Sequence, residues 1–265
     1  MTSPFGGGPT ESGVLVSVAL LDVDGALVFG QAEHQVHYAA SVMKIAVLVA
    51  VHRCMDAGIL SSRAVVDVTA PVLSPVTGDP VLVEADANDP TLLAMGCASV
   101  ATLIDRMITI SSNEATNHLI NLVGAPACDQ VWRDIGATGC EVGRLLYDGG
   151  AREAGATNTI TALGAAKLMH AIYTHQVAHR SSCRAMRATL QAQRHRDLIP
   201  PLCPPGSVIG NKEGASTGVR HDVAYVRPPE GSPFTLAVSA SGTATLTEMD
   251  TLLANEITAA LAVRP

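Results

Sequence analysis

The chain has 265 residues, of which 48% are hydrophobic and 15% charged, so it can build one large domain or two closely packed ones around a sizeable core and is not a disordered chain. A net charge of −7 argues against a nucleic-acid partner, because such a surface needs a basic patch. Aromatic residues make up only 3%, so stacking platforms for bases are not expected either.

The N-terminal end shows neither a secretory signal nor a membrane span. Residues 1–12 are polar and glycine-rich and are predicted to be a flexible tail, and no positive charge precedes the first apolar run. That run, Val14–Leu21, is too short to span a bilayer and is closed by Asp22 and Asp24. We therefore expect a cytoplasmic protein without membrane contact, or an exported one if this sequence lacks its signal.

The cysteines and histidines predict no metal centre. None of the cysteines forms a C-x-x-C pair or a zinc-ligand pattern, so we expect six reduced, mostly buried thiols, at positions 54, 97, 128, 140, 183 and 203. His175 and His179 lie four residues apart on a predicted helix, but no third ligand is evident. Neither a metal nor an organic cofactor is predicted.

The first elements are predicted to be a β-hairpin and a long apolar helix. Val14–Leu21 and Ala26–Phe29 have strand character and are joined through Asp24-Gly25, a dipeptide typical of hairpin turns. Ala39–Ala57 follows as a helix that ends at Gly58.

The start of this helix contains Ser41 and Lys44, three residues apart and therefore on one helix face. Lys44 is the only charged residue between His37 and Arg53, so we expect apolar side chains around it. Burial lowers the pKa of a lysine, and a neutral amine one turn from a hydroxyl is a base beside a latent nucleophile. A surface lysine on an ordinary helix is the alternative.

The middle of the chain is predicted to be mainly helical. Apolar residues with a helical period run through Ala98–Ile110, Glu114–Val123 and Thr161–His179, and Thr161 is placed as an N-cap. Residues 140–160 interrupt the pattern with several glycines and are predicted to form an Ω-type loop.

The turn between the first two of these helices holds Ser111, Ser112 and Asn113. A serine and an asparagine two residues apart can point into one cleft, where the hydroxyl of Ser111 relays a proton and the amide of Asn113 orients a substrate and a lysine. The alternative is a helix N-cap formed by Ser112 or Asn113, since both residue types are common caps.

The last quarter is predicted to contain three strands and a closing amphipathic helix, at Ser207–Lys212, Val219–Val226, Phe234–Ala240 and Thr243–Val263. Lys212, at the end of the first strand, can bind a substrate carboxylate as a point charge. Gly214 lets a substrate backbone approach the edge strand closely.

Strands at both ends and helices between them predict an α+β fold. The two chain ends form one antiparallel sheet flanked by helices, and an all-helical domain is inserted between them. We expect an α/β sandwich domain from residues 13–58 and 191–265, and a helical domain from residues 59–190.

In chain order, S-x-x-K at 41–44, S-x-N at 111–113 and K-x-G at 212–214 resemble the signature set of the penicillin-recognising serine hydrolases, and within them the class A β-lactamases. The segment from Met107 to Ile120 resembles the class A stretch around S-D-N, with Ser112 in place of the aspartate. Asn158–Ala162 is similar to the family's D-T-T-T-P. The resemblance covers roughly residues 14–263 and implies the fold predicted above, with the site between its two parts.

The resemblance implies a catalytic role for three residues. Ser41 would be the acylated nucleophile, Lys44 its base or part of the base network, and Ser111 the relay of a proton to the leaving nitrogen. The family's oxyanion hole uses backbone N–H groups, one of them from the nucleophile.

The resemblance also implies binding roles. Asn113 would hold the substrate amide, and Lys212 and Gly214 would bind the substrate carboxylate and backbone on the edge strand. Arg220 resembles a family arginine that helps to bind the carboxylate, with a plain structural arginine as the alternative.

The Ω-type loop departs from the family pattern. Class A β-lactamases carry E-x-x-L-N there, and its glutamate activates the deacylating water. Matching Arg144 to the arginine that opens the family loop puts Leu146 at the glutamate position. Asp148 and Glu153 are the only acids nearby, and either could substitute; ordinary surface acids are the alternative for both.

The K-T-G motif is also altered, because Glu213 stands at its middle position. This carboxylate should repel a penicillin-like carboxylate unless Lys212, Arg220 or His221 neutralises it.

The sequence therefore predicts a serine hydrolase that acts through an acyl-Ser41 intermediate on a β-lactam or another small amide or ester, with weak β-lactam turnover. The alternatives are a DD-peptidase or esterase on the same scaffold, or a penicillin-binding or sensing module that does not turn over. The expected partner is a small-molecule substrate; the sequence predicts no oligomeric state.

Overall fold

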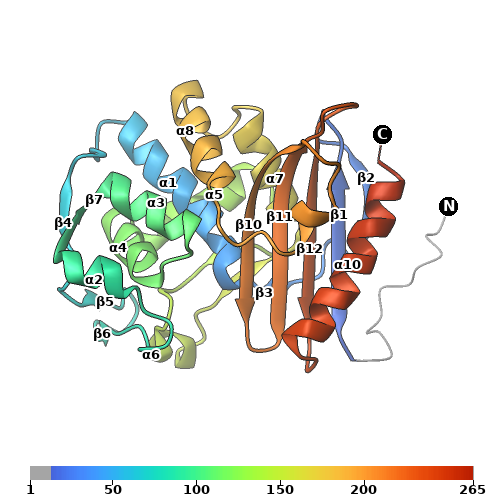
Figure 1. Cartoon of the computed structure of the whole chain (residues 1–265). Helices are drawn as coiled ribbons and strands as arrows, with labels where there is room; N and C mark the ends of the chain where they lie inside the picture. Colours follow the sequence, from blue (N-terminus) through green and yellow to red (C-terminus); the bar gives the residue numbers. More distant parts are fainter. Residues whose placement is uncertain (1–12, 265) are drawn as a thin grey trace.

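A computed structural model describes residues 13–264 (Figure 1). The predicted tail at residues 1–12 lies outside the described residues.

A five-stranded antiparallel sheet joins the two ends of the described chain, as predicted. Its strand order is β10-β11-β12-β1-β2, and its members are β1 (Leu15–Leu21), β2 (Leu27–Gln31), β10 (Val208–Ser216), β11 (Val219–Arg227) and β12 (Phe234–Ser241). The predicted hairpin between β1 and β2 is present, and the Asp22 carboxylate caps its turn by accepting the backbone N–H groups of Asp24 and Ala26. The site-bearing strand β10 lies at the open edge of this sheet.

Helices cover both faces of the sheet, which explains why β1, β11 and β12 are buried almost throughout. On one face α10 (Leu246–Ala262) crosses β1, β11 and β12, with the short α9 (Ile199–Leu202) beside it (Figure 1). On the other face α7 (Ala162–Tyr173) packs against the same three strands, and α8 (Arg180–Gln191) packs against β10.

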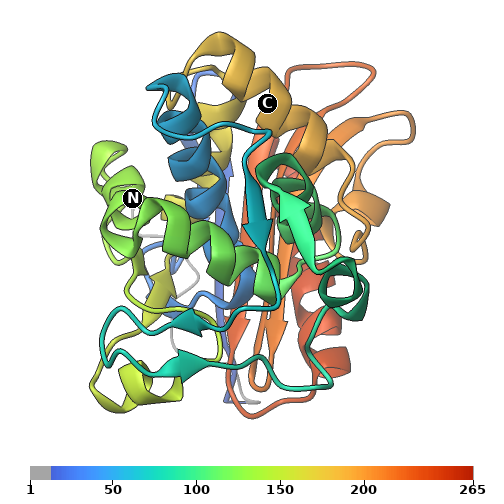
Figure 2. The same cartoon turned by 90° about the vertical axis from the view of Figure 1, so that its left-hand side faces the viewer.

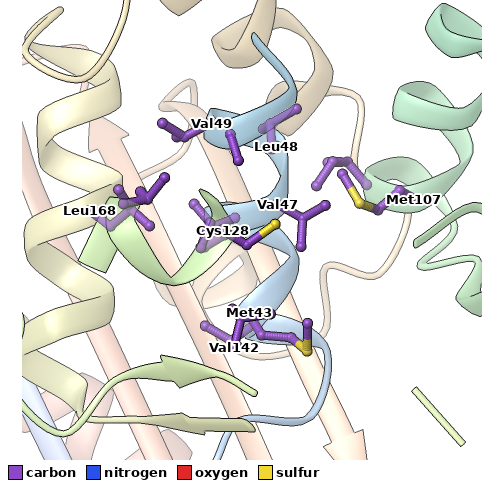
Figure 3. Packing of buried hydrophobic residues seen from close by; sticks show 14 of the residues in the cluster. Met43, Val47, Leu48, Val49, Met107, Cys128, Val142 and Leu168 are labelled. Atoms are coloured by element: carbon purple, nitrogen blue, oxygen red, sulfur yellow. The ribbon is translucent and has the colours of Figure 1, made fainter. Parts of the chain in front are cut away.

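The helix α1 (Lys44–Asp56) is the centre of the larger hydrophobic core. Around it pack α3 (Val100–Thr109), α4 (Asn113–Val123) and α5 (Ala125–Asp134), together with α7 and α8. Figure 3 shows Val47 and Leu48 of α1 among residues from surrounding elements, including Met107, Cys128 and Leu168. Each such buried aliphatic side chain stabilises the fold by about 1.5–3 kcal/mol, so α1 is held firmly and positions its first residues.

Short elements complete the described chain, several of them in the part of the molecule that faces the viewer in Figure 2. They are β3 (His37–Tyr38), β4 (Val65–Asp67), β5 (Val72–Leu73), β6 (Pro80–Val81), α2 (Pro90–Met95), β7 (Cys97–Ser99), β8 (Glu141–Val142), α6 (Gly149–Glu153) and β9 (Asn158–Ile160). The predicted Ω-type segment thus contains two short strands and one helical turn.

Two predicted helices differ from the observed ones at their ends. The helix predicted at Ala39–Ala57 begins with a 3-10 turn, η1 (Ala40–Met43). The helix predicted at Thr161–His179 does begin at the Thr161 cap, whose hydroxyl accepts the Gly164 N–H, but it ends at Tyr173. His175 has φ +62°, in the left-handed region, so the prediction that His175 and His179 share a helix is wrong.

The division into a sandwich domain and a helical domain at residues 58 and 190 stays a proposal. The helices α7 and α8, both inside residues 59–190, lie against the sheet.

Within residues 13–264 all six cysteines are free, and no group of His, Cys, Asp and Glu side chains is placed to hold a metal ion. In the same range, no helix combines the length and the apolar character that crossing a membrane requires.

Candidate active site

A cleft of about 1000 Å³ lies where η1, the α3–α4 turn, the Ω-type segment and the end of β10 meet. Its walls include Ser41, Ser111 and Asn113 of the predicted motifs, and Glu213 of the altered third motif. Other lining residues come from the Ω-type segment and from the loop before α2: Arg144, Leu146, Tyr147, Asp148, Arg152, Glu84 and Asp86.

The 3-10 turn presents Ser41 to this cleft. Ala40, the first residue of this turn, has φ +43°, a strained conformation for a residue with a side chain. The tight turn leaves Ser41 partly exposed, whereas Lys44, the first residue of α1, is fully buried. The S-x-x-K pair therefore has its hydroxyl in the cleft and its amine beneath the cleft wall.

Lys44 reaches across to the α3–α4 turn. Its Nζ donates to the carbonyl oxygen of Ser111 at 2.6 Å and to Oδ1 of Asn113 at 3.0 Å, and lies 3.1 Å from Oγ of Ser111. Burial lowers the pKa of Lys44 well below its ordinary value, and the charge of Lys212 lowers it further. The chain thus places a lysine that favours its neutral form beside two motif residues.

Ser111 occupies the turn between α3 and α4 with φ +61°. A residue other than glycine held in this region costs of order 1–3 kcal/mol, and such strain clusters at functional sites. The next residue, Ser112, is the N-cap of α4, because its hydroxyl accepts the Ala115 N–H. The N-cap interpretation is confirmed for Ser112, and the catalytic role of Ser111 stays a prediction.

Lys212 approaches Ser111 from β10 on the other side. Its Nζ donates to Oγ of Ser111 at 3.0 Å and to the carbonyl oxygen of Glu213 at 2.8 Å. Burial lowers the pKa of Lys212 to about 8, against the opposing charges of Glu213 and Asp222. Below that pH Lys212 is mainly a cation, so Ser111 lies between this charge and Lys44, whose pKa is also lowered.

Gly214 is the point where β10 meets η1. A Cβ at this position would lie 3.1 Å from the backbone nitrogen of Ser41 and 3.2 Å from that of Val42. Only glycine allows the edge strand to approach this closely.

Arg220 does not reach the cleft. Its Nη1 pairs with Oε2 of Glu213 at 2.5 Å and its Nε with Oδ1 of Asp250 at 2.7 Å, and it is not among the residues that line the cleft. Residue 220 lies opposite Ala215 in the β10–β11 register, so Glu213 is its diagonal neighbour on the same sheet face.

Both polar atoms of the Asn113 side chain are already hydrogen-bonded within the protein, which the sequence does not predict. Its Oδ1 accepts from Lys44, and its Nδ2 donates to the carbonyl oxygen of Ala87 at 3.0 Å. The side chain thus ties α4 to the loop that precedes α2.

The Ω-type segment places Leu146 in the cleft wall, where Asn117 holds its backbone. The N–H of Leu146 donates to Oδ1 of Asn117 at 2.8 Å, and Nδ2 of Asn117 donates to the carbonyl oxygen of Leu146 at 2.9 Å. Asp148 is 2% exposed, and its Oδ1 caps α6 by accepting the Ala151 N–H. Its Oδ2 has no hydrogen-bond partner within the described chain, although Asp148 lines the cleft. Glu153 is exposed and is not a lining residue.

Sequence reasoning did not select two residues that the structure brings to the site. Glu114 is buried, and burial raises the pKa of its carboxyl, which acts electrostatically on Lys44. Its position directly after Asn113 is the signal that could have drawn attention to it. Tyr147 lines the cleft with φ +63°, and no sequence pattern indicates this backbone conformation.

Residues 10–262 match the model of the Beta-lactamase2 family, described as a β-lactamase enzyme family. The chain belongs to this family. It is therefore a serine hydrolase of the class A β-lactamase-like type that acts on a small-molecule substrate, and the resemblance stated from the three motifs is confirmed.

Solved structures of this family share the fold over nearly the whole chain. A β-lactamase from Sphaerobacter thermophilus is 25% identical with a TM-score of 0.77, over 96% of this chain and 94% of that chain. A β-lactamase from Xanthomonas campestris is 23% identical with a TM-score of 0.78, over 95% and 92%. A PBP-A mutant in an acyl-enzyme complex with penicillin G is 22% identical with a TM-score of 0.76, over 94% and 89%. No curated protein sequence gave a significant match.

Proposed function

We propose that this β-lactamase family member forms an acyl-enzyme on Ser41 with β-lactams or related small amides and esters, and releases it slowly. The observation that carries the proposal is the buried Lys44, whose pKa is lowered and whose Nζ contacts Ser111 and Asn113 behind the cleft that Ser41 lines.

The contacts of Ser111 support a defined proton arrangement. A charged Lys212 donates to Oγ of Ser111, whose hydroxyl proton can then point to the lone pair of a neutral Lys44. Lys44 still donates to the carbonyl oxygen of Ser111 and to Asn113, so its two remaining protons are both used. A neutral amine has a single lone pair, so the Ser111 hydroxyl proton must turn away from Lys44 before Lys44 accepts the proton of Ser41.

Acylation then proceeds with a balanced proton transfer. Oγ of Ser41 attacks the carbonyl carbon, and its proton passes to Lys44. The carbon–nitrogen bond, or the carbon–oxygen bond of an ester, breaks as the leaving atom receives a proton through Ser111. The products are the acyl ester on Ser41 and the protonated leaving group, and Lys44 is neutral again.

Deacylation lacks the usual base. Hydrolysis requires a water to attack the acyl carbonyl while its proton is removed, and Leu146 occupies the position matched to the family glutamate. Asp148 is the substitute that the geometry favours over Glu153, because Asp148 lines the cleft and has an unpartnered Oδ2. With Oδ1 already used as a helix cap, we infer that Asp148 serves this step poorly.

Slow release leaves a penicillin-binding or sensing module as the second candidate function, favoured by Leu146. The PBP-A mutant that shares the fold was solved as an acyl-enzyme with penicillin G. A DD-peptidase or esterase would use the same acylation step and differ in the leaving group.

A fluorophosphonate probe tests the nucleophile directly. Wild-type protein should be labelled on Ser41, and Ser41→Ala should lose the label while its thermal unfolding is nearly unchanged, since Ser41 is partly exposed. Full labelling of Ser41→Ala would refute the assignment. Ser112→Ala, which removes the helix cap and a hydrogen bond to Asp89 but no group of the proposed chemistry, is the control and should keep the label.

A further inference from the structure

We propose that the cleft selects substrates that present a cationic amine, and not a carboxylate, beside Glu213. The proposal rests on the acyl-Ser41 chemistry above and names the substrate class for the same site.

Arg220, which the sequence suggested as a carboxylate-binding residue, is not available to a substrate. Its guanidinium is buried and is paired with both Glu213 and Asp250, at 2.5 Å and 2.7 Å. A substrate carboxylate would have to displace one of these two carboxylates to reach it. These three side chains carry one excess negative charge, which the buried ammonium group of Lys212 balances below about pH 8.

Lys212 is equally unavailable. It is fully buried, it is not among the residues that line the cleft, and its Nζ is directed to Ser111 and to the carbonyl oxygen of Glu213. At this end of the cleft the charged side chain among the lining residues is Glu213 itself. Its Oε2 is bound to Arg220, whereas its Oε1 has no hydrogen-bond partner in the described part of the chain.

Acidic residues outnumber basic ones among the residues that line the cleft. The acidic lining residues are Glu84, Asp86, Asp148 and Glu213, against two basic ones, Arg144 and Arg152. The guanidinium of Arg144 is buried and donates to the carbonyl oxygen of Leu145 and to the hydroxyl of Tyr38. Asp148, one of these acids, is buried, and its Oδ2 has no hydrogen-bond partner within the described chain.

Beside Glu213 an anionic substrate would therefore meet a carboxylate whose neighbouring cations, Arg220 and Lys212, are already bound, whereas an amine would gain an acceptor and an opposite charge there. The two lining arginines without an ion-pair partner in the described chain, Arg144 and Arg152, belong to the Ω-type segment. For a partly solvated pair of charges, we expect a change of about tenfold in the acylation rate for each unit of substrate charge.

Three chromogenic cephalosporins that differ only at the C4 carboxyl group test this. The group is the free acid (anion), the methylamide (neutral) or the 2-aminoethylamide (cation), and the second-order rate of Ser41 acylation is followed by intact mass. We expect the order cation, neutral, anion, with about tenfold between neighbours, and a preference that shrinks in high salt. Fastest reaction with the anion or with the neutral compound would overturn the proposal.

The variant Glu213→Gln keeps the shape of the side chain and removes its charge. It should reduce the preference for the cation over the anion by about tenfold or more, because it also frees Arg220. Glu230→Gln is the matched control, since Glu230 is exposed beyond the end of β11 that lies away from Glu213, and it should leave the order unchanged. An unchanged order in Glu213→Gln would contradict the assigned role of Glu213.

The fluorophosphonate separates this proposal from the function on which it rests. If it labels Ser41 but the cephalosporins react in the reverse order, acyl-serine chemistry stands and the cation preference fails. If it does not label Ser41, the proposed function itself fails. Where no cephalosporin acylates, protection of Ser41 from the fluorophosphonate by the same three compounds reports the order of binding.

Discussion

The two buried lysines of the site share one serine and differ in charge. Lys44 and Lys212 both contact Oγ of Ser111, at 3.1 Å and 3.0 Å. Two ammonium groups on one buried hydroxyl would repel each other, so the pair holds one proton fewer than two free lysines. Burial and the charge of Lys212 both lower the pKa of Lys44, so we assign the neutral form to Lys44 in the proposed mechanism.

This assignment predicts the pH dependence of acylation. Because burial lowers the pKa of Lys212 to about 8, the cation that polarises Ser111 is present below that pH and is lost above it. The acylation rate should therefore fall on the alkaline side with a midpoint near pH 8, measured by mass spectrometry after rapid quenching at a series of pH values. A rate that keeps rising through pH 9 and above would show that the charge of Lys212 is not needed.

The variant Lys44→Arg complements this profile. Arginine keeps the positive charge but does not lose its proton in this range, so acylation should fall about 10²–10⁴-fold at every pH. Near-normal acylation of Lys44→Arg would make Lys44 an electrostatic or structural residue.

Single residues show where sequence reasoning succeeds and where it stops. The burial of Lys44 could be predicted, because the apolar run around it leaves no polar neighbour along the chain. The ion pairs of Arg220 with Glu213 and Asp250 could not be predicted, because they depend on strand register and on where α10 packs. The free Oδ2 of Asp148 likewise depends on the local fold of the Ω-type segment.

At the scale of elements, the site depends on how closely β10 and η1 meet. Gly214 and Gly210 lie on the same strand, and both are crowded for different reasons. A Cβ at Gly214 would lie 3.1 Å from the nitrogen of Ser41, whereas one at Gly210 would clash with the hydroxyl of Tyr173. The first contact belongs to the cleft and the second to the packing between β10 and α7.

The two alanine variants should therefore separate activity from stability. Gly214→Ala should slow acylation about ten- to a hundredfold, because it shifts the edge strand away from Ser41, with little change in unfolding temperature. Gly210→Ala should cost about 1–3 kcal/mol of unfolding free energy by overpacking. Denaturant unfolding and fluorophosphonate labelling of both variants check this; the reverse pattern would place the site elsewhere on β10.

Most strands and helices followed from local pattern. The Asp-Gly turn, the apolar terminal strands and the Thr161 cap each carry a local signal that the structure confirms. No local sequence signal indicates the 3-10 turn at Ala40–Met43 or the helix end at Tyr173. Both coincide with residues in the left-handed region, Ala40 and His175. Tertiary packing decides such conformations, and no residue-type preference reports them.

At the scale of the whole molecule, the fold agrees with the family, whereas the altered motifs bear on the rates of acylation and deacylation. The match of residues 10–262 to the family model establishes the family and the serine hydrolase activity, and the shared architecture agrees with it. The rate of each half-reaction depends on a few side chains in the cleft. Leu146 and Glu213 depart from the family pattern, and we expect both to act against rapid hydrolysis of an anionic β-lactam.

The central claim is that acylation of Ser41 outruns deacylation. General-base assistance of the kind missing at Leu146 is typically worth about 10²–10⁴-fold in rate, so the acyl-enzyme should accumulate with any β-lactam that reacts.

The most direct test is an intact-mass time course after mixing the protein with excess penicillin G. The account predicts one penicilloyl adduct per chain, located on Ser41 by peptide mapping and persisting while free penicillin is only slowly consumed. Rapid consumption of penicillin without a detectable adduct would contradict it.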